Sequence, residues 1–425
     1  MIILLVGSIL LLAMFTSVST YYTSTHFDQF NQSVVKQYNE KFQEEGIQIK
    51  FKSKKSLSLN QEDQYVITLY QTYFDENKIH VQLKEPVTFT IKQKCKVWPF
   101  YIDCQNKVKI NTAHPFSINS KVWEQLNYQW NWQYTVITQR ITSQLSVKPF
   151  KINYPKKIKF DDMKFFYESD RNLQYNTLNI YLDHVKLENK NYESIEFNNL
   201  HTELLFDMLK QQPWTTQLSL QVDEIHAYRI SETLFRINEL FLRYNVNEPP
   251  KKQVKLENLW TMKSLYISSE SPVNFDDFSA DIRVQGIHKQ VAKLYSELGI
   301  YTENMNENKA RTLLNTVNPT PILLQINQIK TGYNQVDMKL DGEVKFPAYI
   351  EKKIDGFEHY IDQIKGNLNL TFSKNIESIY PIMHTLLPIY EKEKVVTKTD
   401  LGNYQMKVKI NKGHLLINKK IIGAL

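Results

Sequence analysis

Small groups of titratable residues are the places where this sequence could carry out chemistry. The adjacent carboxylates Asp161–Asp162 and Asp276–Asp277 could act as an acid and a base. The residues HTE at 201–203 have the H-x-E spacing of zinc deaminases, and DEIH at 223–226 could hold a carboxylate against an imidazole. Adjacent side chains of a strand point to opposite faces, however, and the paired cysteines of the deaminase signature are absent. We therefore expect solvated polar groups here, no catalytic residues, and a protein that is not an enzyme.

Cofactor and metal motifs are also missing. The ten histidines are scattered along the chain, and neither HEXXH nor GXSXG occurs. None of the eleven glycines lies between Gly46 and Gly286, so a phosphate-cradling loop cannot be drawn in this region. We expect neither a cofactor nor a metal ion.

Cys95 and Cys104 are the two cysteines of the chain. Pro99 lies between them and suggests a turn, so the two thiols could face each other across a short hairpin. A redox pair or a metal site would need a C-x-x-C spacing or neighbouring histidines, which this stretch lacks. We expect a structural disulfide, which agrees with an oxidising compartment.

Aromatic residues are concentrated in VWEQLNYQWNWQYTVI (122–137). Trp130, Trp132 and Tyr134 alternate, so on a strand they share one face, and Trp123 lies close by. Such a face could stack sugar rings or bases, or it could be a core ladder. We favour the core ladder, because aromatic side chains stabilise cross-strand packing.

The N-terminal stretch is apolar. No residue from Met1 to Phe15 is charged, and a helix extended to Val18 would be roughly 27 Å long, about one hydrocarbon core. Small residues at 17–19 favour cleavage by a signal peptidase, whereas Tyr21 and Tyr22 suit the headgroup layer and favour a retained anchor. We predict a retained transmembrane anchor over residues 1–19.

A second helix is expected directly after this anchor. Apolar residues recur every three or four positions from Phe27 to Phe42, which is the stripe of an amphipathic helix. Gly46 is well placed to end it. We therefore predict an amphipathic helix over residues 20–46.

The positive net charge of +7 does not point to nucleic acid. Lysines alternate with other residues in QIKFKSKKS (48–56) and MKVKINK (406–412), as they do on the solvated face of a sheet. We therefore expect no nucleic-acid partner, and at most a weak attraction to anionic headgroups beside the anchor.

Alternation with period two dominates the chain after Gly46. It is found at 47–51, 65–69, 79–83, 87–91, 178–182, 336–340 and 404–410, with turns at 75–78 and 411–413. Helical patterns occur at 288–299, 304–317 and 375–390, the last interrupted by Pro381 and Pro388. The expected fold is α+β, with predominantly antiparallel sheets, a few packing helices and one N-terminal transmembrane helix. Pro249–Pro250 suggest a boundary between an N-terminal β-rich unit (47–248) and a C-terminal helix-plus-sheet unit (251–425).

The two ends of the chain resemble a known family. The helix FDQFNQSVVKQYNEKFQEEGIQIKFK after the apolar segment, the stretch IHKQVAKLYSEL to ARTLLNTVNPTPILLQINQIKT, and the ending YQMKVKINKGHLLINKK are similar to the YdgA-like family of bacterial envelope proteins. That family has no defined catalytic residues. Its final turn tends to read Asn-Gly-Lys, whereas this chain has Asn418-Lys419-Lys420. The architecture is also distantly similar to AsmA-like proteins, in which an anchored β-rich body is thought to carry lipid. The resemblance implies a single-pass protein of the bacterial inner membrane with its bulk in the periplasm.

Two functions fit these observations. The first is a non-enzymatic, membrane-anchored periplasmic protein that binds or carries a lipid or another apolar ligand, because strands with one apolar face must cover that face. The residues expected to line such a groove are Ile79, Val81, Leu83, Val87, Phe89, Ile91, Leu218, Leu220 and Val222. A closed sandwich of two sheets would leave no groove. The second function is a structural or protein-interaction module of the envelope, with an envelope protein or a second copy of the chain as its partner.

Overall fold

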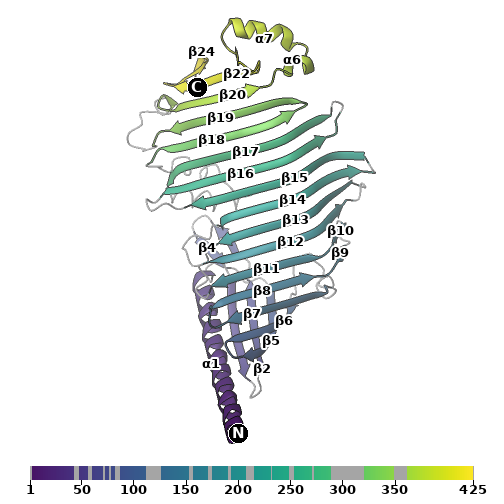
Figure 1. Ribbon diagram of the computed structural model, residues 1–425, viewed down its shortest axis with the longest axis vertical. Coiled ribbons are helices and arrows are strands. Elements are labelled where there is room, and N and C mark those ends of the chain that lie inside the picture. The colour runs from purple at the N-terminus through teal and green to yellow at the C-terminus, as the bar shows by residue number, and fades with distance from the viewer. Residues whose placement is uncertain are drawn as a thin grey trace. The chain divides into compact units, whose positions relative to one another are not determined.

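The computed structural model describes residues 2–42, 47–55, 60–69, 72–75, 78–81, 87–111, 126–152, 157–170, 175–189, 193–206, 215–230, 232–247, 253–269, 272–288, 320–348 and 361–424. The chain divides into two compact units, Met1–Leu182 and Asp183–Leu425. Antiparallel strands make up most of both, together with a few helices, which confirms the expected α+β class (Figure 1).

The first unit is one long helix on an antiparallel sheet. Its helix is α1 (Ile2–Phe42). The strands β1 (Ile47–Lys55), β2 (Asn60–Leu69), β5 (Val87–Trp98), β6 (Tyr101–Asn111), β7 (Tyr128–Thr135), β8 (Arg140–Val147), β11 (Met163–Asp170) and β12 (Asn176–Glu188) pair in that order. Two hairpins interrupt the meander, β3 (Thr72–Asp75) with β4 (Lys78–Val81) and β9 (Phe150–Ile152) with β10 (Lys157–Phe160). The division between the units falls within β12.

Helix α1 is continuous, where the sequence predicted an anchor followed by a second helix. It ends at Phe42, and Gly46 lies outside the described residues. Among the helical residues whose side chains are described, which begin at Phe15, no segment is long and apolar enough to cross a membrane. The later turns of α1 pack on the sheet through the buried residues Phe27 and Phe30.

The β5–β6 hairpin holds both cysteines. Its turn is Pro99–Phe100, and Phe100 takes the left-handed conformation (φ 61°). Cys95 and Cys104 are directly opposite each other in the register and form the expected disulfide. Both are buried, so the disulfide is a structural link inside the first unit.

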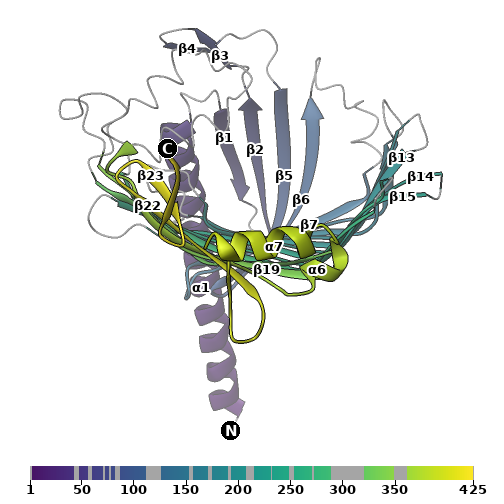
Figure 2. The same cartoon turned by 90° about the horizontal axis from the view of Figure 1, so that it is seen from above.

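The second unit is a single antiparallel sheet of long strands. The strands β13 (Glu193–Phe206), β14 (Thr215–Arg229), β15 (Glu232–Asn247), β16 (Gln253–Ile267), β17 (Val273–His288), β18 (Ile322–Tyr333), β19 (Val336–Phe346), β20 (Lys365–Phe372), β22 (Tyr404–Asn411), β23 (His414–Ile417) and β24 (Lys420–Ala424) pair in that order. The short strand β21 (Thr397–Lys398) also pairs with β22. Figure 2 shows these strands as one curved layer.

The division between the two units falls at Leu182–Asp183, not at the expected boundary at Pro249–Pro250. These prolines lie outside the described residues, between β15 and β16, and those two strands pair with each other inside the second unit. The strands on either side of these prolines therefore belong to one unit.

The helical segment expected at 375–390 is confirmed, with a break where the sequence placed one. Helix α6 (Ile376–Ile379) ends before Pro381, and α7 (Met383–Lys392) contains Pro388. These helices pack on the end of the sheet, where Leu387, Val396 and Tyr404 form a buried cluster with Phe372 and Met406. Of the other helices expected from sequence, 304–317 lies outside the described residues, as does 288–299 except for His288, which ends β17.

Candidate functional site

The sheet of the second unit has one apolar face. Side chains that share this face follow from the register of the paired strands. They are Phe197, Leu200 and Leu204 of β13; Leu218, Leu220, Val222, Ile225 and Ala227 of β14; Phe235, Ile237, Leu240, Leu242, Tyr244 and Val246 of β15; Leu256, Trp260, Met262, Leu265 and Ile267 of β16; Phe275, Phe278, Ala280, Ile282 and Val284 of β17; and Leu324, Ile326 and Ile329 of β18. We call this set the apolar face.

Polar groups are scarce on this surface. Asn258 and Thr202 are the uncharged exceptions within the same rows from β13 to β17, and Tyr244 supplies a phenol. No Asp, Glu, Lys, Arg or His occupies these rows among the described residues of β13–β17. The opposite side of the same strands carries residues such as Arg243, Glu257 and Arg283. The sheet is therefore strongly amphipathic.

The apolar face is only partly buried. Trp260 is 48% exposed and Ile267 is 39% exposed, and most of the other side chains on the face are intermediate. In the described part of this unit, no helix packs on β13–β17 and no second sheet faces them. A sandwich core would bury both inner faces, so the closed sandwich weighed from the sequence is not what the described strands of this unit form.

A row of polar pairs crosses this sheet and shifts the alternation by one residue. In β14 the apolar positions are even up to Val222 and odd from Ile225 onwards, because Asp223 and Glu224 both leave the apolar face. The neighbouring strands do the same at the paired positions, which are Asn198–Asn199 in β13, Asn238–Glu239 in β15, Lys263–Ser264 in β16 and Asp276–Asp277 in β17. We call this row the polar seam.

In alternate strands a left-handed residue accompanies the shift. Asn199 (φ 50°), Glu239 (φ 50°) and Asp277 (φ 49°) take the left-handed conformation, one in each alternate strand. A left-handed residue rotates the strand locally, as in a β-bulge, so that two successive side chains can face the same side. Asp223, Asn238, Glu239, Lys263 and Ser264 of the polar seam line one depression of the sheet.

Hydrogen bonds and an ion pair join neighbouring side chains of the polar seam in β13–β16. Asn199 Nδ2 donates to Asp223 Oδ2 at 2.9 Å, and Lys263 Nζ lies 2.5 Å from Glu239 Oε1. The acid–base pair weighed at Asp276–Asp277 belongs to this row. His226, the other half of the 223–226 candidate, instead lies 3.1 Å from Thr233 Oγ1. The seam is thus a structural feature of the sheet.

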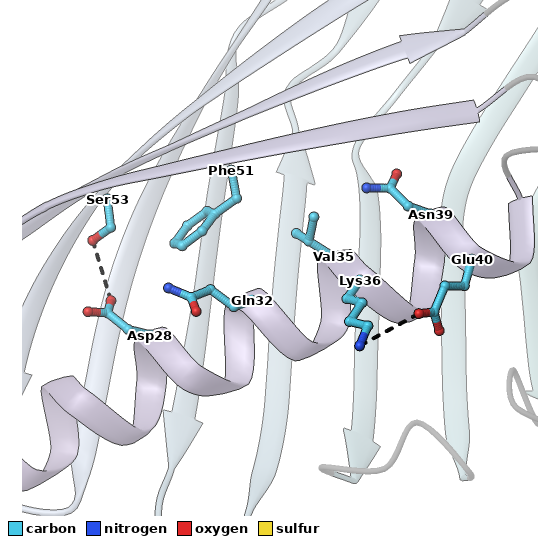
Figure 3. Close-up of a pocket in the computed structure, with 8 residues that line it drawn as sticks. All are labelled: Asp28, Gln32, Val35, Lys36, Asn39, Glu40, Phe51 and Ser53. Carbon is cyan, nitrogen blue, oxygen red and sulfur yellow. Dashed lines mark hydrogen bonds and ion pairs between the residues drawn. The ribbon is translucent and has the colours of Figure 1, made fainter.

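A second polar cluster lies beneath α1 in the first unit. Gln61 is 2% exposed, and its amide nitrogen donates to Asp28 Oδ1 at 2.7 Å and to Asp63 Oδ1 at 3.0 Å. Ser53 also donates to Asp28, at 3.3 Å. Asp28 and Ser53 belong to the lining of a depression between α1 and β1, shown in Figure 3. One buried amide therefore links a carboxylate of the helix to a carboxylate of the sheet.

The cluster continues across the sheet to the tryptophans. With its amide oriented to satisfy its neighbours, the Gln93 side chain donates to Asp63 Oδ2 at 3.3 Å and accepts a hydrogen bond from the Trp132 indole N–H. Burial raises the pKa of Tyr65 well above its ordinary value, and the nearby Asp63 and Asp28 raise it further. No histidine takes part in these contacts. Among the described residues, no group of three His, Cys, Asp or Glu side chains could hold a metal ion.

The aromatic stretch of the sequence lies in the core of the first unit. Phe27 of α1 contacts Trp132 and Tyr134, with ring centroids 5.1 and 5.8 Å apart, and Phe30 stacks on Tyr134 at 5.1 Å. Trp130 donates to Ser143 Oγ at 2.8 Å. These contacts support the expected core ladder, formed here between a helix and a sheet, and Trp123 lies outside the described residues.

The groove residues expected from sequence belong to both units. Phe89 and Ile91 lie on β5 of the first unit, in rows with apolar residues of β1 and β2, and Val87 begins the same strand. Ile79 and Val81 belong to the separate β3–β4 hairpin, and Leu83 lies outside the described residues. Leu218, Leu220 and Val222 are on the apolar face of the second unit. Those three therefore share one surface of the second unit.

Sequence reasoning missed most of the apolar face. It named residues of β14 only, although β13, β15, β16 and β17 contribute more side chains. One signal in the sequence could have identified these strands: each has two successive polar residues near its middle, with alternating apolar residues on both sides.

Comparison with known proteins adds no relative: no family model, no curated protein and no solved structure matches this chain.

Proposed function

We propose that this protein is a non-enzymatic, membrane-anchored envelope protein that binds lipid acyl chains on the apolar face of its second unit. The observation that carries the proposal is the face itself: a continuous apolar surface across β13–β18 whose rows hold no charged residue in β13–β17 and whose side chains are incompletely buried. Exposed apolar surface of this extent costs free energy in water and marks a binding surface.

Acyl chains suit this surface better than a specific small molecule does. The face offers rows of aliphatic and aromatic side chains with few polar groups that could fix an orientation, whereas pockets for small ligands place several polar groups precisely. A flexible hydrocarbon chain needs only apolar contact along its length. The polar side of the same strands, with its ion pairs, keeps the sheet soluble.

The N-terminal segment and the resemblance at both ends support an envelope location. The uncharged stretch from Met1 to Phe15 suits a retained anchor in the inner membrane, with the bulk of the chain in the periplasm. The Cys95–Cys104 disulfide agrees with an oxidising compartment. The similarity to YdgA-like proteins points to the same place.

The test places one negative charge on either side of the same strand. Trp260 is on the apolar face and 48% exposed, so Trp260→Glu should leave the fold intact while repelling an acyl chain. Thr261→Glu adds the same charge at the next residue, on the polar side. The full-length protein is extracted in mild detergent, and bound phospholipid is measured by native mass spectrometry.

We expect a phospholipid adduct in the wild-type protein and in Thr261→Glu, and at least a tenfold lower bound fraction in Trp260→Glu. A wild-type protein without lipid in several detergents would overturn the proposal, as would equal binding by both variants. Circular dichroism of the three proteins shows that the comparison is made between folded chains.

A further inference from the structure

Aliphatic side chains are exposed on the C-terminal part of the second unit, away from the apolar face. We call residues 373–424 the C-terminal cap. In it, Leu401 is 82% exposed, Ile382 66%, Ile421 62%, Ile422 48% and Ile389 47%. Isolated exposed leucines are ordinary, but a helix, a turn and a strand that all expose aliphatic side chains in one small region are not.

Helix α7 shows how the cap separates its two faces. Met383 and Leu387 pack into the cluster on the sheet. Ile382 precedes the helix and Ile389 lies seven residues later, so both are on another side of α7. The helix therefore presents an aliphatic stripe to solvent in addition to its packed stripe.

Hydrogen bonds connect the segments that carry Leu401, Ile421 and Ile422 to residues at the ends of the two helices. Asn418 Nδ2 donates to Val395 O at 2.9 Å, and Lys420 Nζ lies 3.1 Å from Glu393 Oε2, so β24 starts beside the end of α7. Ile421 and Ile422 follow directly. The turn that carries Leu401 is tied to the start of α6, where Asn403 Oδ1 accepts from the Lys374 N–H at 3.4 Å.

The charge of this region is positive. Residues 373–424 contain nine lysines, no arginine and four acidic residues, which gives +5 of the net +7 of the whole chain. Lys394, Lys398, Lys419 and Lys420 are all exposed and lie in the same loops and strand ends as the aliphatic residues. Lysines next to exposed aliphatic side chains are typical of segments that lie on an anionic bilayer.

We infer that the C-terminal cap docks on the surface of a bilayer that contains anionic lipids, with Leu401, Ile421 and Ile389 entering the headgroup region and lysines contacting the phosphates. A protein partner fits less well, because hot spots of protein interfaces are rich in Trp, Tyr and Arg, whereas the exposed set here is five aliphatic residues with one tyrosine, Tyr390, and lysines. This inference concerns a surface other than the apolar face, and it does not depend on lipid binding there.

A dye at the cap itself tests the inference independently of the N-terminal segment. Leu401→Cys in the full chain is labelled with an environment-sensitive fluorophore, while the native cysteines stay paired. The protein, kept in an amphipathic polymer, is mixed with vesicles of phosphatidylcholine alone or with added phosphatidylglycerol. We expect a blue shift, and quenching by brominated acyl chains, with the anionic vesicles only, and reversal at high salt.

Two controls make the result specific to the cap. The same dye at Thr261→Cys, on the polar side of the sheet, should not respond to either vesicle. Neutralising Lys394→Gln together with Lys419→Gln should raise the lipid concentration needed for the Leu401 signal at least tenfold. No shift with anionic vesicles, or an equal shift with both kinds, would overturn the inference. A shift that grows with protein concentration in the absence of lipid would replace the bilayer by a second copy of the chain.

Discussion

At the scale of single residues, buried amides position α1 on its sheet. Gln61 and Asp63 of β2 are almost completely buried, and Gln61 holds Asp28 of the helix at 2.7 Å. Asn39 adds a second fixed point, since its side chain donates to Ile49 O at 2.8 Å and accepts from Ile49 N at 2.7 Å. Such paired polar contacts specify one register of a helix that aromatic packing alone would hold less precisely.

Removing the Gln61 side chain should destabilise the first unit. Gln61→Ala would leave the carboxylates of Asp28 and Asp63 without their shared donor, and losing hydrogen bonds to charged groups costs roughly 1.5–3 kcal/mol each. We expect the free energy of unfolding to fall by about 3 kcal/mol, measured in urea with tryptophan fluorescence, because Trp132 reports on this core.

The matched control is Lys94→Ala, which removes an exposed ion pair with Glu62 on the neighbouring strand. Exposed pairs contribute roughly 0–1 kcal/mol, so this variant should unfold close to the wild type. A loss below about 1 kcal/mol for Gln61→Ala would show that the amide does not hold the two carboxylates together in solution.

At the scale of elements, the polar seam explains how each strand keeps a continuous apolar face. In a strand with a strict period of two, residues of the same parity, odd or even, lie on the apolar face along its whole length. At the seam each strand uses two successive polar residues, and the left-handed residues lie in alternate strands. The apolar face is thus built in two halves that have opposite parity in sequence.

The seam also marks where sequence reasoning stopped. A period-two pattern identified 178–182, 336–340 and 404–410, which all lie within strands of the structure. In β14 the same reasoning found Leu218 to Val222 and lost the strand after Asp223, where the parity changes. Asn199 and Glu239 take the left-handed conformation although neither is a glycine, the residue that usually indicates a positive φ. The sequence around them therefore could not predict the shift. Pairing between strands distant in sequence was equally invisible.

Turn geometry shows the same limit at a smaller scale. The ending of the chain lacks the glycine that similar endings place after the asparagine, which left the final turn uncertain from sequence. In the structure Asn418 (φ 46°) and Lys419 (φ 74°) both take positive φ and close the β23–β24 hairpin. Two left-handed residues are what a tight hairpin turn of this hand requires, and asparagine tolerates that conformation well.

A β-branched residue at the seam should be costly. Glu239 has φ 50°, a conformation that is a strong outlier for isoleucine. We therefore expect Glu239→Ile to lower the free energy of unfolding by roughly 1–2 kcal/mol, although isoleucine favours strands elsewhere. Gln221→Ile is the control, since it adds the same side chain to the polar side of the adjacent strand at an ordinary backbone position, and it should be nearly neutral. Equal effects of the two variants in urea unfolding would contradict a left-handed residue at 239.

At the scale of the whole molecule, the two units differ in what covers the apolar face of their strands. In the first unit, the later turns of α1 cover the sheet, so aromatic and polar side chains meet in a closed core. In the second unit, the described helices α6 and α7 pack only at the end of the sheet, on residues such as Phe372 and Tyr404. The proposed acyl chains would take on β13–β18 the role that α1 has in the first unit.

Photo-cross-linking can test this role and the parity shift together. A benzophenone amino acid is placed at single positions of β14 in the full-length protein, which is irradiated in its membrane and analysed for lipid adducts. We expect adducts at Leu220 and at Ile225, an even and an odd position, and none at Gln221 or Glu224. A strictly alternating strand would instead give adducts at 220 and 224. That outcome would refute the parity shift but would still support lipid binding on this face. Adducts at none of these positions would refute lipid binding on the apolar face. The parity shift is tested separately by the unfolding of Glu239→Ile, so the two experiments together show which of these two claims fails.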